Sequence, residues 1–163
     1  MKLNYLKIIF ISISLALSSC GYSMRGAINI PDSIKSVSVQ SKEYSELVNI
    51  INSSLVSSDI KLSTSKSKDI YKVVILSENF NRRQLSINIS GRVNEYELIY
   101  EVNFQLQAPN KKVIIDKITL YRDYSFDENN VMGNTDREDD IKKDMMSTAS
   151  TLIFHKLKAS ASK

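Results

Sequence analysis

The sequence has few of the residues that carry most enzyme chemistry. Its 163 residues include one cysteine, Cys20, one histidine, His155, and no tryptophan. A single cysteine excludes an internal disulfide. No second histidine or further cysteine is present to complete a pair of a catalytic nucleophile and a base. His155 lies where the last turns of a helix are expected, a favourable place for a cation, and we interpret it as a solvated residue. The sequence therefore does not predict an enzyme.

Motifs that hold metals or phosphates are also missing. The acidic run of residues 127–130 lacks the alternating oxygen ligands and the closing glycine and glutamate of a calcium loop. The four glycines form no phosphate-binding cradle. No serine has the Gly-x-Ser-x-Gly context of a hydrolase nucleophile. We predict no metal and no cofactor.

The charge is nearly balanced. The chain has 22 basic and 18 acidic residues, and two of the basic ones, Lys2 and Lys7, precede the apolar N-terminal stretch. A nucleic-acid-binding protein usually carries a strong basic excess on one face. We therefore expect no nucleic-acid partner.

An apolar stretch lies at the start of the chain, over residues 8–17, and Leu17-Ser18-Ser19-Cys20 follows it. This order of charged, apolar and small residues is typical of a secretory signal peptide, and the stretch is too short to span a bilayer. A leucine three positions before a cysteine, with small residues between, also matches the site where a bacterial lipoprotein signal is cut. We predict a cleaved signal peptide over residues 1–19.

Cys20 would then be acylated, and two or three acyl chains give stable membrane attachment. Lipoproteins kept at the inner membrane often carry aspartate after the cysteine, whereas Gly21 occupies this position. We therefore expect an outer-membrane anchor. After it we predict a linker over residues 20–32, a single domain over residues 33–158 and a flexible tail over residues 159–163.

The clearest pattern in the domain covers residues 93–106, where apolar and polar side chains alternate as in a half-buried strand. The apolar face comprises Tyr96, Leu98, Tyr100, Val102, Phe104 and Leu106. The opposite face includes four residues that we expect to meet solvent or a partner: Glu97, Glu101, Asn103 and Gln105. Unpaired carboxylates are costly to bury, so helices should cover only the apolar face.

The remaining elements follow from similar patterns. Further strands are expected over residues 33–40, 70–76, 84–90 and 113–126, with a turn at residues 79–83 and a glycine turn at Gly91. One helix should cover residues 41–57 with Ser41 as its cap, and a second should begin at the capping box of Thr135 and Glu138 and end near residue 158. Asp116 and Arg122 fall on an apolar face, a conflict that a bulge or the strand ends would remove. The fold class is α+β, a two-layer sandwich with two helices on one face of a small mixed, largely antiparallel sheet.

Several patches together resemble the LptE family of lipopolysaccharide-assembly lipoproteins, also called rare lipoprotein B. They are residues 20–26 (CGYSMRG), 94–98 (NEYEL), 121–127 (YRDYSFD) and 138–145 (EDDIKKDM). The resemblance implies a domain lodged in the LptD β-barrel of the outer membrane, where the pair inserts lipopolysaccharide into the outer leaflet. A polar sheet face is compatible with a polar barrel lumen. The alternative is a structural or adaptor lipoprotein of the periplasmic face that never contacts lipopolysaccharide.

The resemblance also implies lipopolysaccharide binding by basic residues before the central strand and near the start of the last helix. Arg92 and Arg137 lie close to these places, although Ile89 and Asn134 align with the family positions themselves. Arg82 and Arg83 are further candidates, since a guanidinium suits bidentate phosphate contacts. The simpler interpretation of all four arginines is solvated loop residues.

Overall fold

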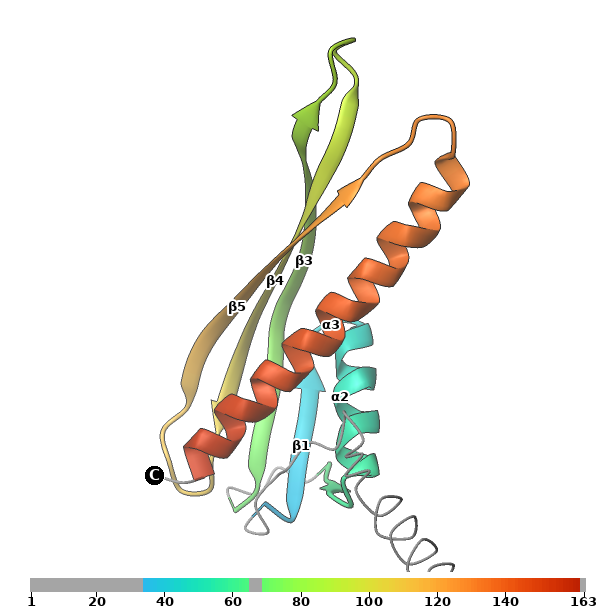
Figure 1. The fold of residues 1–163 in the computed structure, drawn as a ribbon. Helices are drawn as coiled ribbons and strands as arrows, with labels where there is room; N and C mark the ends of the chain where they lie inside the picture. Colours follow the sequence, from blue (N-terminus) through green and yellow to red (C-terminus); the bar gives the residue numbers. More distant parts are fainter. Residues whose placement is uncertain (1–33, 65–68, 162–163) are drawn as a thin grey trace, which may run out of the picture.

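Two helices lie on one face of a mixed five-stranded sheet with strand order β2-β1-β3-β4-β5 (Figure 1). This computed structural model describes residues 34–64 and 69–161, so the expected signal peptide, Cys20 and the linker of residues 20–32 lie outside the described residues. The arrangement confirms the predicted α+β fold. The elements are β1 (Ser36–Ser41), α2 (Glu46–Ser57), β2 (Lys61–Leu62), β3 (Tyr71–Ile87), β4 (Val93–Gln107), β5 (Ile114–Ser125) and α3 (Val131–Ala161).

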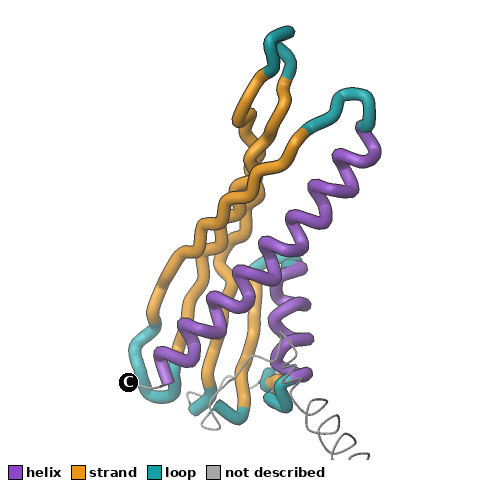
Figure 2. Tube along the Cα trace, in the orientation of Figure 1, coloured by secondary structure: helices purple, strands orange, loops and turns teal. Residues whose placement is uncertain are grey.

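The sheet combines a parallel part with a long antiparallel part. β1 runs parallel to both β2 and β3, and α2 lies on the connection that parallel neighbours require. β3, β4 and β5 form an antiparallel meander. These three strands extend past the start of α2, and only α3 continues along them (Figure 2). No helix of the described part is long and apolar enough to cross a membrane.

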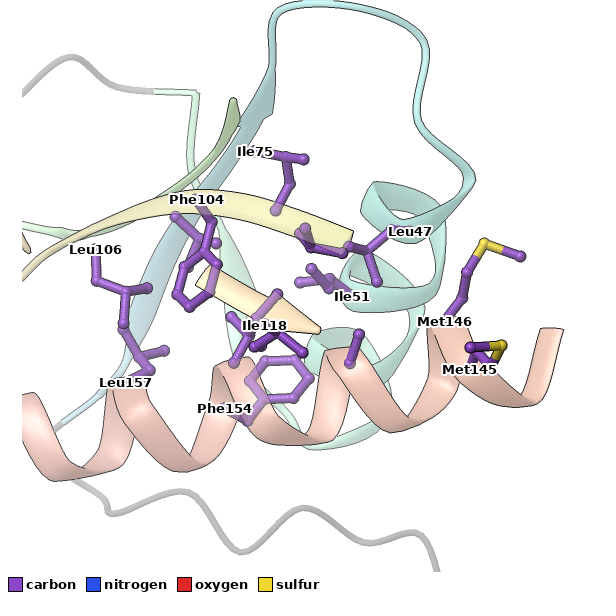
Figure 3. Close-up of a cluster of buried hydrophobic side chains, with 14 of the residues drawn as sticks. Leu47, Ile51, Ile75, Phe104, Leu106, Ile118, Met145, Met146, Phe154 and Leu157 are labelled. Carbon is purple, nitrogen blue, oxygen red and sulfur yellow. The ribbon is translucent and has the colours of Figure 1, made fainter. Parts of the chain in front are cut away.

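One apolar cluster joins the two layers, and Figure 3 shows side chains from both helices and from the sheet meeting in it. The predicted inner face of β4 is confirmed, since Leu98, Tyr100 and Phe104 are almost fully buried. Burial of each such side chain contributes on the order of 1.5 to 3 kcal/mol. The helices contribute Leu47, Ile51, Leu55, Met145, Met146, Ala149, Ile153, Phe154 and Leu157.

The start of α2 differs from the prediction. Ser41 belongs to β1, and the cap is Ser45, whose hydroxyl accepts a hydrogen bond of 3.0 Å from the Val48 amide. Tyr44, which was expected on the packed face, precedes the helix and is 91 % exposed. The helical periodicity therefore holds only from Leu47 onward.

The turn predicted at residues 79–83 is wrong, because β3 runs through it without a break. Cross-strand contacts outweigh the low β-propensity of its asparagines and arginines. The Phe80 ring, for example, stacks on Tyr100 with centroids 4.1 Å apart. The chain turns instead after Asn88, whose side chain accepts from the amides of Ser90 and Arg92. Gly91 has a positive φ of 76° there, as predicted.

A bulge near Leu76 changes which side chains of β3 face the helices. Ile75 pairs with Phe104 and Ser77 pairs with Asn103, so the register skips Leu76. Before the bulge the odd-numbered residues face the helices, and after it the even-numbered ones do, among them Phe80 and Arg82. Arg83 consequently lies on the opposite face of the sheet from its neighbour.

The start of α3 also differs from the prediction. The helix begins at Val131, and the Asn130 side chain caps it by accepting 3.0 Å from the Gly133 amide. Thr135 lies inside the helix, where its hydroxyl donates back to the Val131 carbonyl. Glycine suits position 133, because the Cβ of any other residue there would lie 2.4 Å from the Asn130 side chain. The predicted capping box is therefore wrong.

The rest of α3 is longer and packs more broadly than expected. It continues to Ala161, beyond the expected end near residue 158. Leu152, which was expected in the core, is 37 % exposed, whereas Met146 and Phe154 are buried.

Asp116 and Arg122 lie on the inner face of β5, and each forms an ion pair there. The predicted bulge or strand-end position is therefore not what accommodates them. Lys156 of α3 donates to Asp116 at 2.5 Å, and Arg122 lies 3.4 Å from Asp144 of the same helix. The pairing of β4 with β5 shows no register shift. Each charge thus has an oppositely charged partner in a different part of α3.

Candidate functional site

The face of the sheet opposite the helices, called the outer face below, carries the four residues predicted to face a partner. They alternate with the buried side chains of β4. Neighbouring strands supply partners for three of them. Arg83 donates to Glu97 at 2.5 Å, Lys117 donates to Glu101 at 2.5 Å, and Asn103 donates to Ser77 at 2.9 Å. Gln105 is half-buried on the same face.

These contacts cross-link β3, β4 and β5 side by side. Glu97 is only 8 % exposed, yet its charge is paired with Arg83, so the cost of burying a carboxylate is offset. The hydrogen bond with Glu97 raises the pKa of the Arg83 guanidinium, which stays charged. The outer face therefore carries charges of both signs, and Glu97, Glu101 and Asn103 find their partners within the sheet.

Arg82 lies on the helix side of the sheet, where it joins β3 to α3. Its guanidinium donates to Glu138 at 3.0 Å and to the Tyr124 hydroxyl at 3.5 Å. It also lies 4.4 Å from the centroid of the Tyr96 ring, a cation–π geometry. The hydrogen bond with Tyr124 is the largest of several effects that raise the pKa of Arg82. The loop position predicted for Arg82 and Arg83 is thus wrong, because both belong to a paired strand.

Glu138 is the centre of this network. Burial alone would raise the pKa of its carboxyl, but hydrogen bonds from Lys142, Tyr124 and Arg82 outweigh this effect and lower it. The Tyr124 hydroxyl donates at 2.7 Å, and the Lys142 ammonium lies 2.8 Å away. Glu138 is therefore held as a carboxylate.

Arg92 ends the turn between β3 and β4, where its guanidinium pairs with Glu128 of the loop before α3. The Asn134 side chain forms two hydrogen bonds with the backbone of the same loop. Its side-chain amide donates to the Asp127 carbonyl at 2.6 Å, and its oxygen accepts from the Asp127 amide at 3.1 Å. Asn134 is 9 % exposed, and these two hydrogen bonds give it a structural role.

Arg137 is exposed, and it forms no hydrogen bond or ion pair with the residues that the structure describes. It lines a hollow of about 210 Å³ between β5 and the first half of α3. Glu95, Asp123 and Ser125 supply polar groups to the same hollow. Of the four candidate arginines, Arg137 alone has no hydrogen bond or ion pair within the described residues.

The four arginines do not form one cluster. Arg83 lies on the outer face, Arg82 on the helix side, and Arg92 in the turn. They share only one end of the molecule, where the β3–β4 turn, the β5–α3 loop and the start of α3 lie (Figure 1). Sequence reasoning missed the carboxylates that hold three of them, Glu97, Glu128 and Glu138, because their contacts are distant in the chain.

The residues considered for catalysis or metal binding are not brought together. His155 is exposed on α3. Within residues 34–64 and 69–161, no group of three or more histidine, cysteine or acidic side chains is arranged to hold a metal ion.

The geometry defines a class of protein, a two-layer α+β domain with one sheet face that no described helix covers. Solved structures share it. Rare lipoprotein B from Shewanella oneidensis has 27 % sequence identity and a TM-score of 0.71, with 77 % of this chain and 95 % of that chain covered. Lipoprotein B from Nitrosomonas europaea has 23 % identity and a TM-score of 0.71, with 87 % and 93 % covered, and supports the fold alone.

Sequence comparisons identify the family. Residues 34–157 match the LptE family model, described as lipopolysaccharide-assembly. The LPS-assembly lipoprotein LptE of Pectobacterium atrosepticum is 22 % identical over 145 residues, which cover 88 % of this chain and 79 % of that protein. The protein of the same name from Yersinia enterocolitica is 21 % identical, with 88 % and 70 % covered. The chain belongs to the LptE family.

Proposed function

We propose that the chain is a lipid-anchored outer-membrane component of the lipopolysaccharide transport machinery, with no enzymatic role. In this proposal it plugs an LptD-type β-barrel and helps to deliver lipopolysaccharide to the outer leaflet. Family membership supports a role in lipopolysaccharide assembly. The anchor would be Cys20, which lies outside the described residues.

The proposal that the domain plugs a barrel rests on the outer face. No described helix covers it, and two of its carboxylates are paired within the sheet, Glu97 with Arg83 and Glu101 with Lys117. The lumen of an outer-membrane barrel is polar and hydrated. A polar face whose carboxylates pair within the sheet can enter such a lumen without leaving a buried charge unpaired. An apolar outer face would be unsuited to the same place.

The test is a charge variant of the outer face with a matched control. Gln105→Arg with Thr119→Arg adds two long cations to half-buried positions, and Thr119 pairs with Glu101, so one new cation meets a carboxylate. The control, Ser147→Arg with His155→Arg, adds the same charge to exposed positions of α3. The free energy of unfolding of both variants should lie within about 0.5 kcal/mol of that of the parent protein.

Only the outer-face variant should lose co-purification of the barrel and lower the amount of surface lipopolysaccharide. If it retains both while the helix control loses them, the helices and not the outer face contact the barrel. The adaptor alternative makes a different prediction. A protein extracted as a lone monomer, with normal lipopolysaccharide at the surface after either substitution pair, would support a structural lipoprotein.

The anchor has its own test. Cys20→Ala should abolish incorporation of a labelled fatty acid, because the acylated thiol is gone. Continued labelling of the alanine variant would contradict the predicted lipidation site. Location alone does not decide, since a barrel could retain an unlipidated domain at the membrane.

A further inference from the structure

A hollow of about 500 Å³ lies on the helix side of the sheet, between the start of α2, β3 and α3. It exists because β3 continues past the start of α2 while α3 alone follows it (Figure 1). Phe80 and Glu78 of β3 line it, together with Tyr44 and Glu46 at the start of α2 and Met146 of α3. We call these five residues the groove. None of them belongs to the outer face.

Two carboxylates of the groove, Glu46 and Glu78, form no ion pair within the described part of the chain. Glu46 is exposed, and Glu78 accepts a hydrogen bond of 2.7 Å from the buried Tyr100 hydroxyl. Burial first, and then the nearby Glu78 and Glu46 carboxylates, raise the pKa of the Tyr100 phenol above its usual range. Both negative charges therefore act on the same buried hydroxyl.

Asp139, Lys142 and Lys143 of α3 also line the hollow. The two lysines pair with carboxylates of their own helix and not with Glu46 or Glu78. The Lys142 ammonium lies 2.8 Å from Glu138, and that of Lys143 lies 3.9 Å from Asp140. Three carboxylates and two ammonium groups line the hollow, so an excess of negative charge remains next to its apolar atoms. A charge in such a place interacts more strongly than one in bulk water.

The apolar part of the groove is aromatic and flat. Phe80 stacks on Tyr100 at an angle of 11° and faces the hollow with its remaining surface. Tyr44 stands at the rim, 91 % exposed, and Met146 forms part of the wall. A guanidinium is planar, stacks on aromatic rings and pairs bidentately with carboxylates, a combination that an ammonium matches less well.

We propose that the groove receives an arginine side chain from a partner polypeptide, with its plane against Phe80 and its charge shared by Glu46 and Glu78. Charge complementarity selects a basic segment over an acidic or neutral one. A buried arginine stacked on an aromatic ring is a common energetic centre of protein interfaces. This contact would add a second interface on the helix side, independent of the outer face.

The first test uses small probes and the mature, detergent-solubilised protein. Arginine amide should shift the NMR signals of Phe80, Tyr44 and the Met146 methyl group. Citrulline amide should not, because it carries the same α-amino group but a neutral ureido side chain in place of the guanidinium. Glu46→Gln should weaken arginine amide binding at least fivefold. Glu43→Gln is the matched control, because it removes an exposed carboxylate just before α2 that does not line the groove.

Three results would overturn the proposal: equal binding of arginine and citrulline amides, equal loss in Glu43→Gln and Glu46→Gln, or the same shifts with magnesium ions as with arginine amide. Glu78→Gln gives a second variant, with thermal unfolding as its check, since it also alters the contact to Tyr100.

The second test identifies the partner segment in cells. A photoreactive phenylalanine analogue at Tyr44 should cross-link to a peptide that contains arginine, and Glu46→Gln should reduce the yield. The same analogue at Val56, an exposed residue near the other end of α2, is the control. A cross-linked peptide without a basic residue would contradict the proposal. The outer-face variant Gln105→Arg with Thr119→Arg should leave arginine amide binding unchanged, so the two proposals can fail separately.

Discussion

Arg82 and Glu138 form a 3.0 Å ion pair across 56 positions of sequence and thereby join β3 to α3. The same Glu138 oxygen accepts from the Tyr124 hydroxyl of β5. One carboxylate thus holds two strands against the helix. This contact stabilises the end of the molecule that contains the start of α3.

A double-mutant cycle of Arg82→Ala and Glu138→Ala should give a coupling energy of about 0.5 to 1 kcal/mol in urea unfolding. The arginine side chain is 47 % exposed, which limits the interaction, whereas its contacts with Tyr124 and Tyr96 increase it. The cycle of Arg122→Ala and Asp144→Ala is the control. That pair is longer, at 3.4 Å, and its carboxylate side chain is 64 % exposed, so its coupling should be near zero. Equal couplings would contradict a special role for Glu138.

Stability should fall at acidic pH. The pKa of Glu138 is lowered from its ordinary value of 4.5, and that of Asp116 is lowered from 3.8. A carboxyl with a lowered pKa in the folded state stabilises the fold above its unfolded pKa and loses this contribution as pH falls through the folded value. The free energy of unfolding should therefore be flat from neutral pH to about pH 5 and decrease below about pH 4.5.

The variant Glu138→Gln should show a shallower decrease in a series of urea unfolding curves between pH 3 and pH 7. Asp140→Asn on the same helix is the matched control, because its carboxylate is 80 % exposed and lies 3.9 Å from Lys143. It should keep the acid-side slope of the parent protein. A steeper slope in Glu138→Gln would mean that other carboxyls control the acid transition.

Sequence periodicity predicted the parts of the fold where one face is buried. The alternation in β4 and the spacing of Leu47, Ile51 and Leu55 in α2 are direct consequences of burial, and both are confirmed. Gly91 was predictable because its backbone conformation suits glycine. Predictions from local sequence patterns failed where contacts between distant parts of the chain determine the backbone conformation. The polar run of residues 79–83 suggested a turn, whereas pairing with β4 keeps it extended.

The candidate site depended on a feature that the sequence does not reveal. The register skips Leu76, and only for this reason does Arg82 face the helices while Arg83 faces outward. Without the bulge the two arginines would exchange sides. The partner-facing residues of β4 were easier to predict, because their face follows from the buried alternation alone.

The caps of α3 can be distinguished by two alanine substitutions. Asn130→Ala should lower the free energy of unfolding by about 1 kcal/mol, because the Gly133 amide loses its acceptor. Thr135→Ala should change it by less than about 0.5 kcal/mol, because this exposed threonine bonds only to the Val131 carbonyl. Urea unfolding of both variants is the measurement. The reverse order would restore the capping box of Thr135 and Glu138.

Ser150→Ala should leave stability unchanged or raise it by about 0.5 to 1 kcal/mol. The Ser150 hydroxyl is buried on α3 and has no hydrogen-bond partner among the described residues. Burying an unsatisfied hydroxyl is unfavourable, so alanine removes a cost and improves helix propensity. Ser147→Ala, at an exposed position of the same helix, shows the propensity effect alone. A loss of more than about 1 kcal/mol in Ser150→Ala would indicate that the hydroxyl has a partner.

Arg137 should contribute most to lipopolysaccharide binding among the four candidate arginines, because the other three are paired with glutamates. If it contacts a phosphate group, Arg137→Ala should weaken binding of fluorescent lipopolysaccharide by about tenfold or more, the effect of losing a charged hydrogen bond. Arg137→Lys should retain part of the affinity, since an ammonium keeps the charge but not the bidentate geometry. The melting temperature should stay unchanged in both variants, because the side chain is exposed. Lys143→Ala removes an exposed cation from the same helix, and equal weakening by this control would show that general positive charge, and not Arg137, attracts the ligand.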